Sequence, residues 1–67
     1  MKYQAVREGQ FIGAPQVTPE AAEAVIAEDR AHTVACYNQG WIMTFQPYAD
    51  GEEYAEKACR WWIRTVR

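Results

Sequence analysis

The tripeptide Thr18-Pro19-Glu20 marks the start of a helix, and it constrains the fold of this chain more than any other feature. A threonine hydroxyl can accept a backbone N–H bond at a helix N-terminus. Proline fits the first helical position because its missing N–H needs no partner there. Ala22, Val25 and Ile26 then recur at helical spacing. We expect this helix to end near Ala31.

The residues before this helix favour extended structure. Residues 2–7 predict a strand, and residues 8–10 (Glu-Gly-Gln) predict a tight turn. Phe11 and Ile12 then predict the start of a short second strand, which we expect Gly13 and Pro15 to end. The N-terminal part of the chain is therefore expected to supply one or two strands of a sheet.

The segment 33–46 favours a β-hairpin. It is rich in β-branched and aromatic residues, which are typical of strands. Residues 38–40 (Asn-Gln-Gly) tolerate positive φ angles and can form the turn. Trp41, Met43 and Phe45 would then share one face of the second strand, because side chains alternate along a strand.

A rival interpretation extends the first helix through part of the same segment. The helix would continue to Asn38, and Gly40 would follow its end as the residue that often terminates a helix. Thr33 and Cys36 do extend the apolar stripe of the helix at helical spacing. The sequence alone leads us to favour the hairpin.

The end of the chain predicts a second helix. Asp50 and Glu53 form an approximate capping box. An apolar stripe follows at spacings of four, three and four residues, formed by Ala55, Cys59, Trp62 and Val66. The predicted fold is a single α+β domain over residues 1–67. An antiparallel sheet of three to four strands is covered by two helices, in the order β(β)αββα.

Composition supports a folded chain with a near-neutral balance of charge. Of the 67 residues, 49% are apolar and 13% are aromatic, so we expect a compact core. The net charge of −2 argues against a dedicated nucleic-acid domain. The charges are nevertheless polarised, with acids gathered in residues 18–31 and bases in residues 57–67.

No catalytic or metal-binding pattern is present. His32 and Cys36 are the nearest approach to a nucleophile and base, but along a strand they would lie about 13 Å apart. Only a continuous helix would bring them together. The cysteine and histidine spacings match no zinc site, and the glycines form no phosphate loop. We therefore expect no enzyme, no catalytic residue, no metal and no cofactor.

The last predicted helix offers the first candidate binding surface. Trp62 lies at the centre of its apolar stripe and is expected in the core. Trp61 is turned away by about 100° and is expected at the boundary, beside Tyr54, Lys57 and Arg64. Tryptophan, tyrosine and arginine are over-represented at binding hot spots, so we expect these four boundary residues to bind a partner.

The first helix offers an alternative partner-binding surface through the acids Glu20, Glu23 and Glu28. Asp29 is unusual because it lies on the apolar stripe of that helix. We expect it to face an arginine, to cap another group or to mark the end of the helix.

These observations favour a non-enzymatic protein-binding module. In size, composition and general plan the chain resembles the very small α+β inhibitors encoded by phages, anti-CRISPR proteins among them. The resemblance includes no motif and therefore implies no residue roles. Alternatives are single-stranded nucleic-acid binding by the basic and aromatic last helix, or a homodimeric structural subunit.

The expected location is the cytoplasm. The N-terminus has no apolar targeting segment, and no apolar run approaches the length of a membrane span. Two cysteines, Cys36 and Cys59, are too few for a disulfide framework, so we expect reduced thiols. A single bridge between them stays open at this point.

Overall fold

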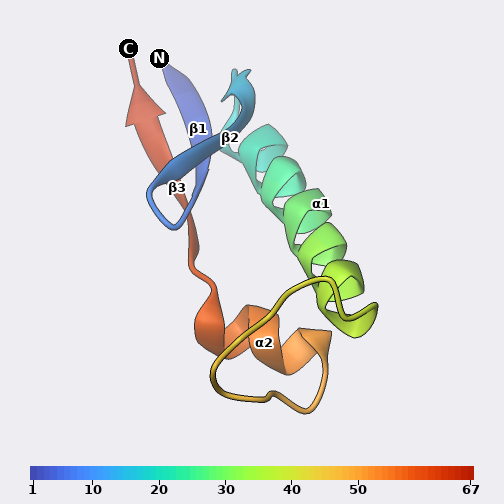
Figure 1. Ribbon diagram of the computed structural model, residues 1–67. Coiled ribbons are helices and arrows are strands. Elements are labelled where there is room, and N and C mark those ends of the chain that lie inside the picture. Colours follow the sequence, from blue (N-terminus) through green and yellow to red (C-terminus); the bar gives the residue numbers. More distant parts are fainter.

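The computed structural model describes residues 1–67 and contains three strands and two helices (Figure 1). In chain order these are β1 (Lys2–Arg7), β2 (Gln10–Gln16), α1 (Pro19–Asn38), α2 (Gly51–Ala58) and β3 (Trp61–Val66). The α+β class, the single antiparallel sheet and the presence of two helices are confirmed. The prediction that both helices cover the sheet is wrong, because α1 packs on all three strands whereas α2 packs against α1. The predicted order β(β)αββα is wrong, because the observed order is ββααβ.

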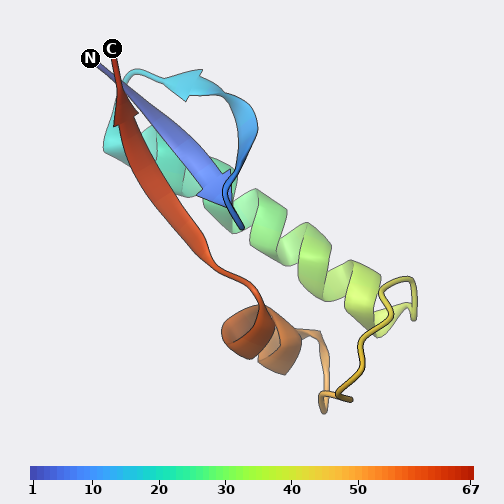
Figure 2. The same ribbon diagram turned by 60° about the vertical axis from the view of Figure 1, so that its left-hand side comes forward.

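The sheet joins the two ends of the chain. Its strand order is β2-β1-β3, and both pairings are antiparallel. The β1–β2 turn is formed by Glu8 and Gly9, which both have positive φ angles (52° and 81°), as a tight hairpin turn requires. Lys2 pairs with Val66, so the two termini lie side by side (Figure 2).

Helix α1 begins as predicted but continues further. The Thr18 hydroxyl accepts the Ala21 N–H at 3.1 Å. The helix then runs to Asn38, and Gly40 follows its end with a φ angle of 81°. The hairpin over residues 33–46 is therefore wrong, and the rival helix is correct. The β-branched residues in this stretch disfavour a helix only weakly, and packing outweighs that preference: Thr33 is buried.

Helix α2 also begins as predicted but ends early. The Asp50 carboxylate accepts the Glu53 N–H at 2.9 Å, which confirms the predicted N-cap. The Glu53 carboxylate returns a bond to the N–H of Ala49, one residue before the cap, at 3.0 Å. The chain becomes extended at Cys59 (φ −114°, ψ 149°).

The predicted continuation of this helix to the end of the chain is wrong. Residues 61–66 form β3, which pairs with β1 along its whole length. Tryptophan, isoleucine, threonine and valine all favour strands, and the pairing with β1 supplies the hydrogen bonds. The apolar residues 55, 59, 62 and 66 therefore do not share one helix face, because only the first belongs to a helix.

The interior is small, so the core is less extensive than the composition led us to expect. Only seven residues are buried, and Val6 is the largest apolar side chain among them. The molecule measures 40 × 17 × 15 Å, because α1 extends beyond the sheet that it covers and packs there against α2 (Figure 2). Its accessible surface is 4944 Å², against about 4,300 Å² for a typical monomer of 7.7 kDa.

Candidate functional site

The two neighbouring tryptophans have environments opposite to those predicted. Trp61 points toward α1, where its indole N–H donates to the Asp29 carboxylate at 2.8 Å. The guanidinium of Arg30 lies 5.6 Å from the centre of the Trp61 ring. Trp62 points to the other face of the sheet and is 44% exposed. Successive side chains of a strand point to opposite faces of the sheet. The observed exposure of the two rings is therefore the reverse of the prediction.

Asp29 holds three elements together. The same carboxylate oxygen that accepts the Trp61 indole N–H also accepts the Arg7 guanidinium at 2.7 Å. One side chain of α1 is thereby joined to the end of β1 and the start of β3. Of the three roles expected for Asp29, facing an arginine is the one that the structure shows, and the helix does not end there. Its carboxylate serves as a structural clamp.

The first predicted binding surface is not assembled. Lys57 lies in the last turn of α2, 3.8 Å from the carboxylate of Glu53. Arg64 lies on the sheet face opposite to Trp61, with its guanidinium 5.9 Å from the centre of the Phe11 ring. Tyr54 lies half-buried on α2. The helix face that would have joined these side chains is absent because β3 replaces it. The binding role of each residue stays a prediction.

The alternative acidic surface has the placement that the sequence predicted. Glu20, Glu23 and Glu28 are exposed and belong to α1. None of the three forms an ion pair within the chain. They are free to meet a basic partner, and that role stays a prediction too.

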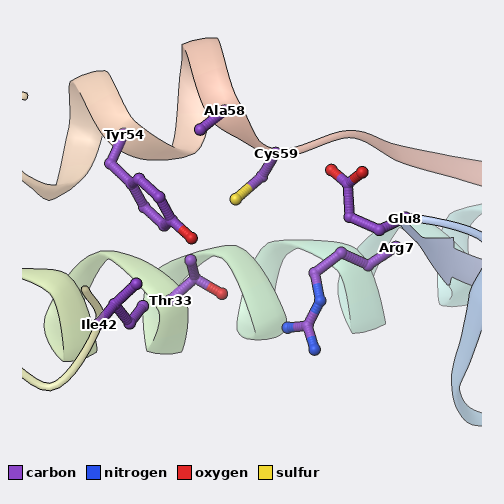
Figure 3. A pocket seen from close by; sticks show the side chains of 7 residues that line it. All are labelled: Arg7, Glu8, Thr33, Ile42, Tyr54, Ala58 and Cys59. Carbon is purple, nitrogen blue, oxygen red and sulfur yellow. The ribbon is translucent and has the colours of Figure 1, made fainter. Parts of the chain in front are cut away.

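A small pocket lies between α1, α2 and the end of β1 (Figure 3). Its volume is about 290 Å³, and Tyr54 and Thr33 point toward each other across it. Arg7 is the one cation that lines it, and that guanidinium is already bonded to Asp29. Pockets for small molecules usually begin near 300 Å³. This cavity is therefore at the lower limit, and its cation is already engaged.

Three tyrosines from separate parts of the chain cluster beside this pocket. The rings of Tyr37 and Tyr54 stack with centres 4.7 Å apart, and Tyr48 meets Tyr54 edge-on at 5.6 Å. The Tyr48 N–H donates to the Tyr37 hydroxyl at 2.9 Å. The cluster fixes the end of the loop between α1 and α2. Sequence reasoning missed it, because nothing in the local pattern links these three positions.

Burial raises the pKa of Tyr54 above its ordinary value of 10.0, and the neighbouring Cys59 thiol adds to the effect. A phenol whose pKa is higher in the folded state contributes fully to stability below the unfolded pKa. That contribution is lost as pH rises through the folded pKa. We expect wild type to lose stability relative to Tyr54→Phe above about pH 10, with no such trend between about pH 7 and 9. Urea unfolding of both proteins across this range measures the difference, and parallel curves would contradict it.

His32 and Cys36 lie together on α1. Because the helix is continuous, the Cys36 sulfur lies 3.5 Å from the His32 Nε2 atom, and the predicted separation of these side chains is wrong. Nucleophilic catalysis also needs a group that orients the base. No third side chain hydrogen-bonds to either residue. Cys36 and Cys59 are both free thiols.

The loop between the two helices carries three large exposed apolar side chains, including the two most exposed in the molecule. We call residues 41–49 the apical loop, because they lie at the end farthest from the termini (Figure 1). Trp41 is 74% exposed, Met43 is 95% exposed and Phe45 is fully exposed. The sequence shows these alternate positions, but it places them on a strand. A shallow hollow of about 290 Å³ lies against Met43, Thr44 and Phe45.

Three comparisons with known proteins leave the geometry as the sole guide to function. No protein-family model, no curated protein and no solved structure matches the chain. The structure contains no group of three or more side chains suited to hold a metal ion. Neither helix has both the length and the apolar character that crossing a membrane requires.

Proposed function

We propose that this chain is a non-enzymatic protein-binding module that acts by occupying the surface of a partner protein. This is the manner of action of the phage-encoded inhibitors that it resembles in size and composition. The apical loop is the contact surface. The observation that carries the proposal is the exposure of Trp41, Met43 and Phe45 together at one end of the molecule.

The composition of the loop suits a protein interface. Aromatic residues and methionine are enriched in the cores of interfaces, and tryptophan is the residue most often found at hot spots. Leaving such side chains in water forgoes about 1.5–3 kcal/mol of burial for each. Trp41, Met43 and Phe45 are all exposed within one short segment, so a single groove on a partner can take all three.

The ends of the loop are held in place before any partner binds. The Trp41 N–H donates to the Cys36 carbonyl at 3.0 Å, which fixes the start of the loop to α1. The hydrogen bonds between Tyr37 and Tyr48 fix its other end. A loop anchored on both sides loses less conformational entropy on binding than a free one. The anchors therefore favour tight binding by a short segment.

Protein is favoured over single-stranded nucleic acid as the partner. The nucleic-acid alternative depends on Trp61 stacking with bases beside Arg64 on one helix. In β3 these side chains point to opposite faces, and the Trp61 indole is bonded to Asp29. The apical loop itself contains no basic side chain. We place the protein in the cytoplasm, where the thiols of Cys36 and Cys59 stay reduced.

Site-specific photocrosslinking in the native host tests this proposal. A benzophenone amino acid replaces Met43 in one protein and Ala27, exposed on α1, in the matched control. We expect one discrete protein adduct from position 43 and none from position 27. Trp41→Ala should weaken binding of that protein by at least about 30-fold, as expected for a hot spot. Adducts to nucleic acid, or identical adducts from both positions, would overturn the proposal.

A further inference from the structure

The outer edge of β3 is unprotected, whereas the outer edge of β2 is not suited to pairing. β2 contains Pro15, Gly13 with a φ angle of 67° and an irregular register opposite β1. β3 contains no proline or glycine and pairs regularly with β1 over six residues. β3 is an edge strand whose single partner is β1, and no segment lies along its outer edge in Figure 2. Natural proteins normally block such an edge or use it for pairing.

The backbone groups on this edge can be identified. The Glu8 N–H donates to the Arg60 carbonyl at 3.0 Å, just beyond the end of the β1–β3 ladder. Hydrogen-bonded and non-hydrogen-bonded pairs alternate along antiparallel strands. The N–H and C=O groups of Trp61, Ile63 and Thr65 therefore point away from β1, toward solvent.

We infer that a second copy of this chain pairs antiparallel along β3, about a two-fold axis at Ile63. The two three-stranded sheets then form one continuous sheet of six strands. Ile63 lies opposite Ile63 of the second copy, and Trp61 lies opposite Thr65. Each of these outward-facing pairs exchanges both of its N–H···O bonds, so all the free groups of the edge are satisfied.

The positions of the arginines select this register. An axis at Arg64 places two Arg64 side chains opposite each other, and an axis at Trp62 places Arg60 opposite Arg64. Like charges directly opposite each other destabilise a strand pair. An axis at Ile63 instead places Trp62 opposite Arg64 twice, on the uncovered face of the sheet. On pairing, the Arg64 guanidinium turns from Phe11 of its own chain to the Trp62 indole of the second copy, and tryptophan is the stronger cation–π partner.

The surface of the single chain agrees with this pairing. Its accessible area exceeds that of a typical monomer of this mass by about 600 Å². Trp61 also lines a groove of about 540 Å³ together with Ile26 and Ala55, at the end of β3. In the inferred register residues 65–67 of the second copy lie opposite residues 59–61, which all line this groove.

This inference is independent of the proposed function. The β3 edge lies beside the termini, and the apical loop lies at the opposite end of the molecule (Figure 1). Substitutions in the loop should leave the pairing unchanged. Substitutions on the edge should leave binding by the loop unchanged, so either idea can fail alone.

Sedimentation equilibrium of the full chain tests the pairing. We expect a species of twice the mass of one chain at about 100 μM. Thr65→Pro removes an outward N–H, blocks the edge without touching the β1 ladder and should weaken pairing at least about tenfold. Thr65→Val keeps the N–H and is the matched control, which should pair like wild type.

The Arg64→Gln variant tests the register. It also tests the pairing itself if the Thr65→Pro variant fails to fold. In the inferred register it removes two cation–π pairs and should weaken pairing roughly fivefold to thirtyfold. Filtered NOE measurements on a mixed labelled sample should connect Trp62 of one copy to Arg64 of the other. A strict monomer, stronger pairing in Arg64→Gln, or undiminished pairing in a folded Thr65→Pro would overturn the inference.

Discussion

Gly51→Ala is expected to cost about 3 kcal/mol of unfolding free energy, a large share of the stability of a chain this small. An alanine Cβ at this position would overlap the Val34 carbonyl oxygen and lie 2.9 Å from two other backbone atoms of Val34. Backbone of a packed helix cannot move aside as a flexible side chain can. The Gly51 N–H also donates to the Asn38 side chain at 2.7 Å, which holds α2 at this distance from α1.

Urea unfolding followed by circular dichroism measures this effect, with Gly9→Ala as the control. Gly9 has a φ angle of 81° but nothing within 4 Å of its added Cβ. Its substitution should cost about 1–2 kcal/mol, from backbone conformation alone. Helix propensity by itself favours alanine at position 51. A Gly51→Ala protein as stable as wild type would contradict the close approach of the two helices.

Asp29→Ala is expected to cost about 2–3 kcal/mol, because it leaves two donors without their shared acceptor. Arg7 and the Trp61 indole both bond to this carboxylate, whose side chain is only 20% exposed. Chemical unfolding gives the change in stability, and the fluorescence of the native state should change as well, since an indole loses its hydrogen bond.

Glu28→Ala is the matched control for the clamp. Glu28 is the preceding residue on α1, is exposed and forms no ion pair within the chain. Its loss should change stability by less than about 0.5 kcal/mol. Equal effects of the two substitutions would mean that Asp29 does not join α1 to the sheet.

Local signals in the sequence predicted the starts of both helices and the turn of the first hairpin correctly. The caps at Thr18 and Asp50 and the turn at Glu8-Gly9 depend on residues within three or four positions of one another. Such contacts are visible in sequence because the side chain itself satisfies the backbone. These positions therefore fixed where helices and turns start.

Distant pairing decided the elements that were predicted wrongly. Residues 61–66 become a strand because β1, near the other end of the chain, pairs with them. The spacing of Cys59, Trp62 and Val66 fits a helix, and nothing nearby contradicts it. Successive side chains lie about 100° apart around a helix but point to opposite faces of a strand. The environments of Trp61 and Trp62 are therefore the reverse of those predicted. Predicting a helix in place of β3 therefore misplaced the whole of the first predicted binding surface.

The apical loop also shows that a local pattern cannot reveal which distant segment lies beside it. The alternation of Trp41, Met43 and Phe45 is plain in the sequence, and it is typical of a half-buried strand. No strand lies beside these residues, so the three apolar side chains are left uncovered. Sequence reasoning found the pattern but could not find the missing neighbour.

The methyl spectrum of the two methionines tests most directly whether the apical loop contacts the partner. The chain contains only Met1 and Met43, which are 79% and 95% exposed. Labelling both methyl groups with carbon-13 therefore gives two signals, one from each end of the molecule. When the partner protein identified by photocrosslinking is added, we expect the Met43 signal to shift and broaden while the Met1 signal stays unchanged. A Met43 signal that stays sharp in a complex shown to have formed would contradict the account.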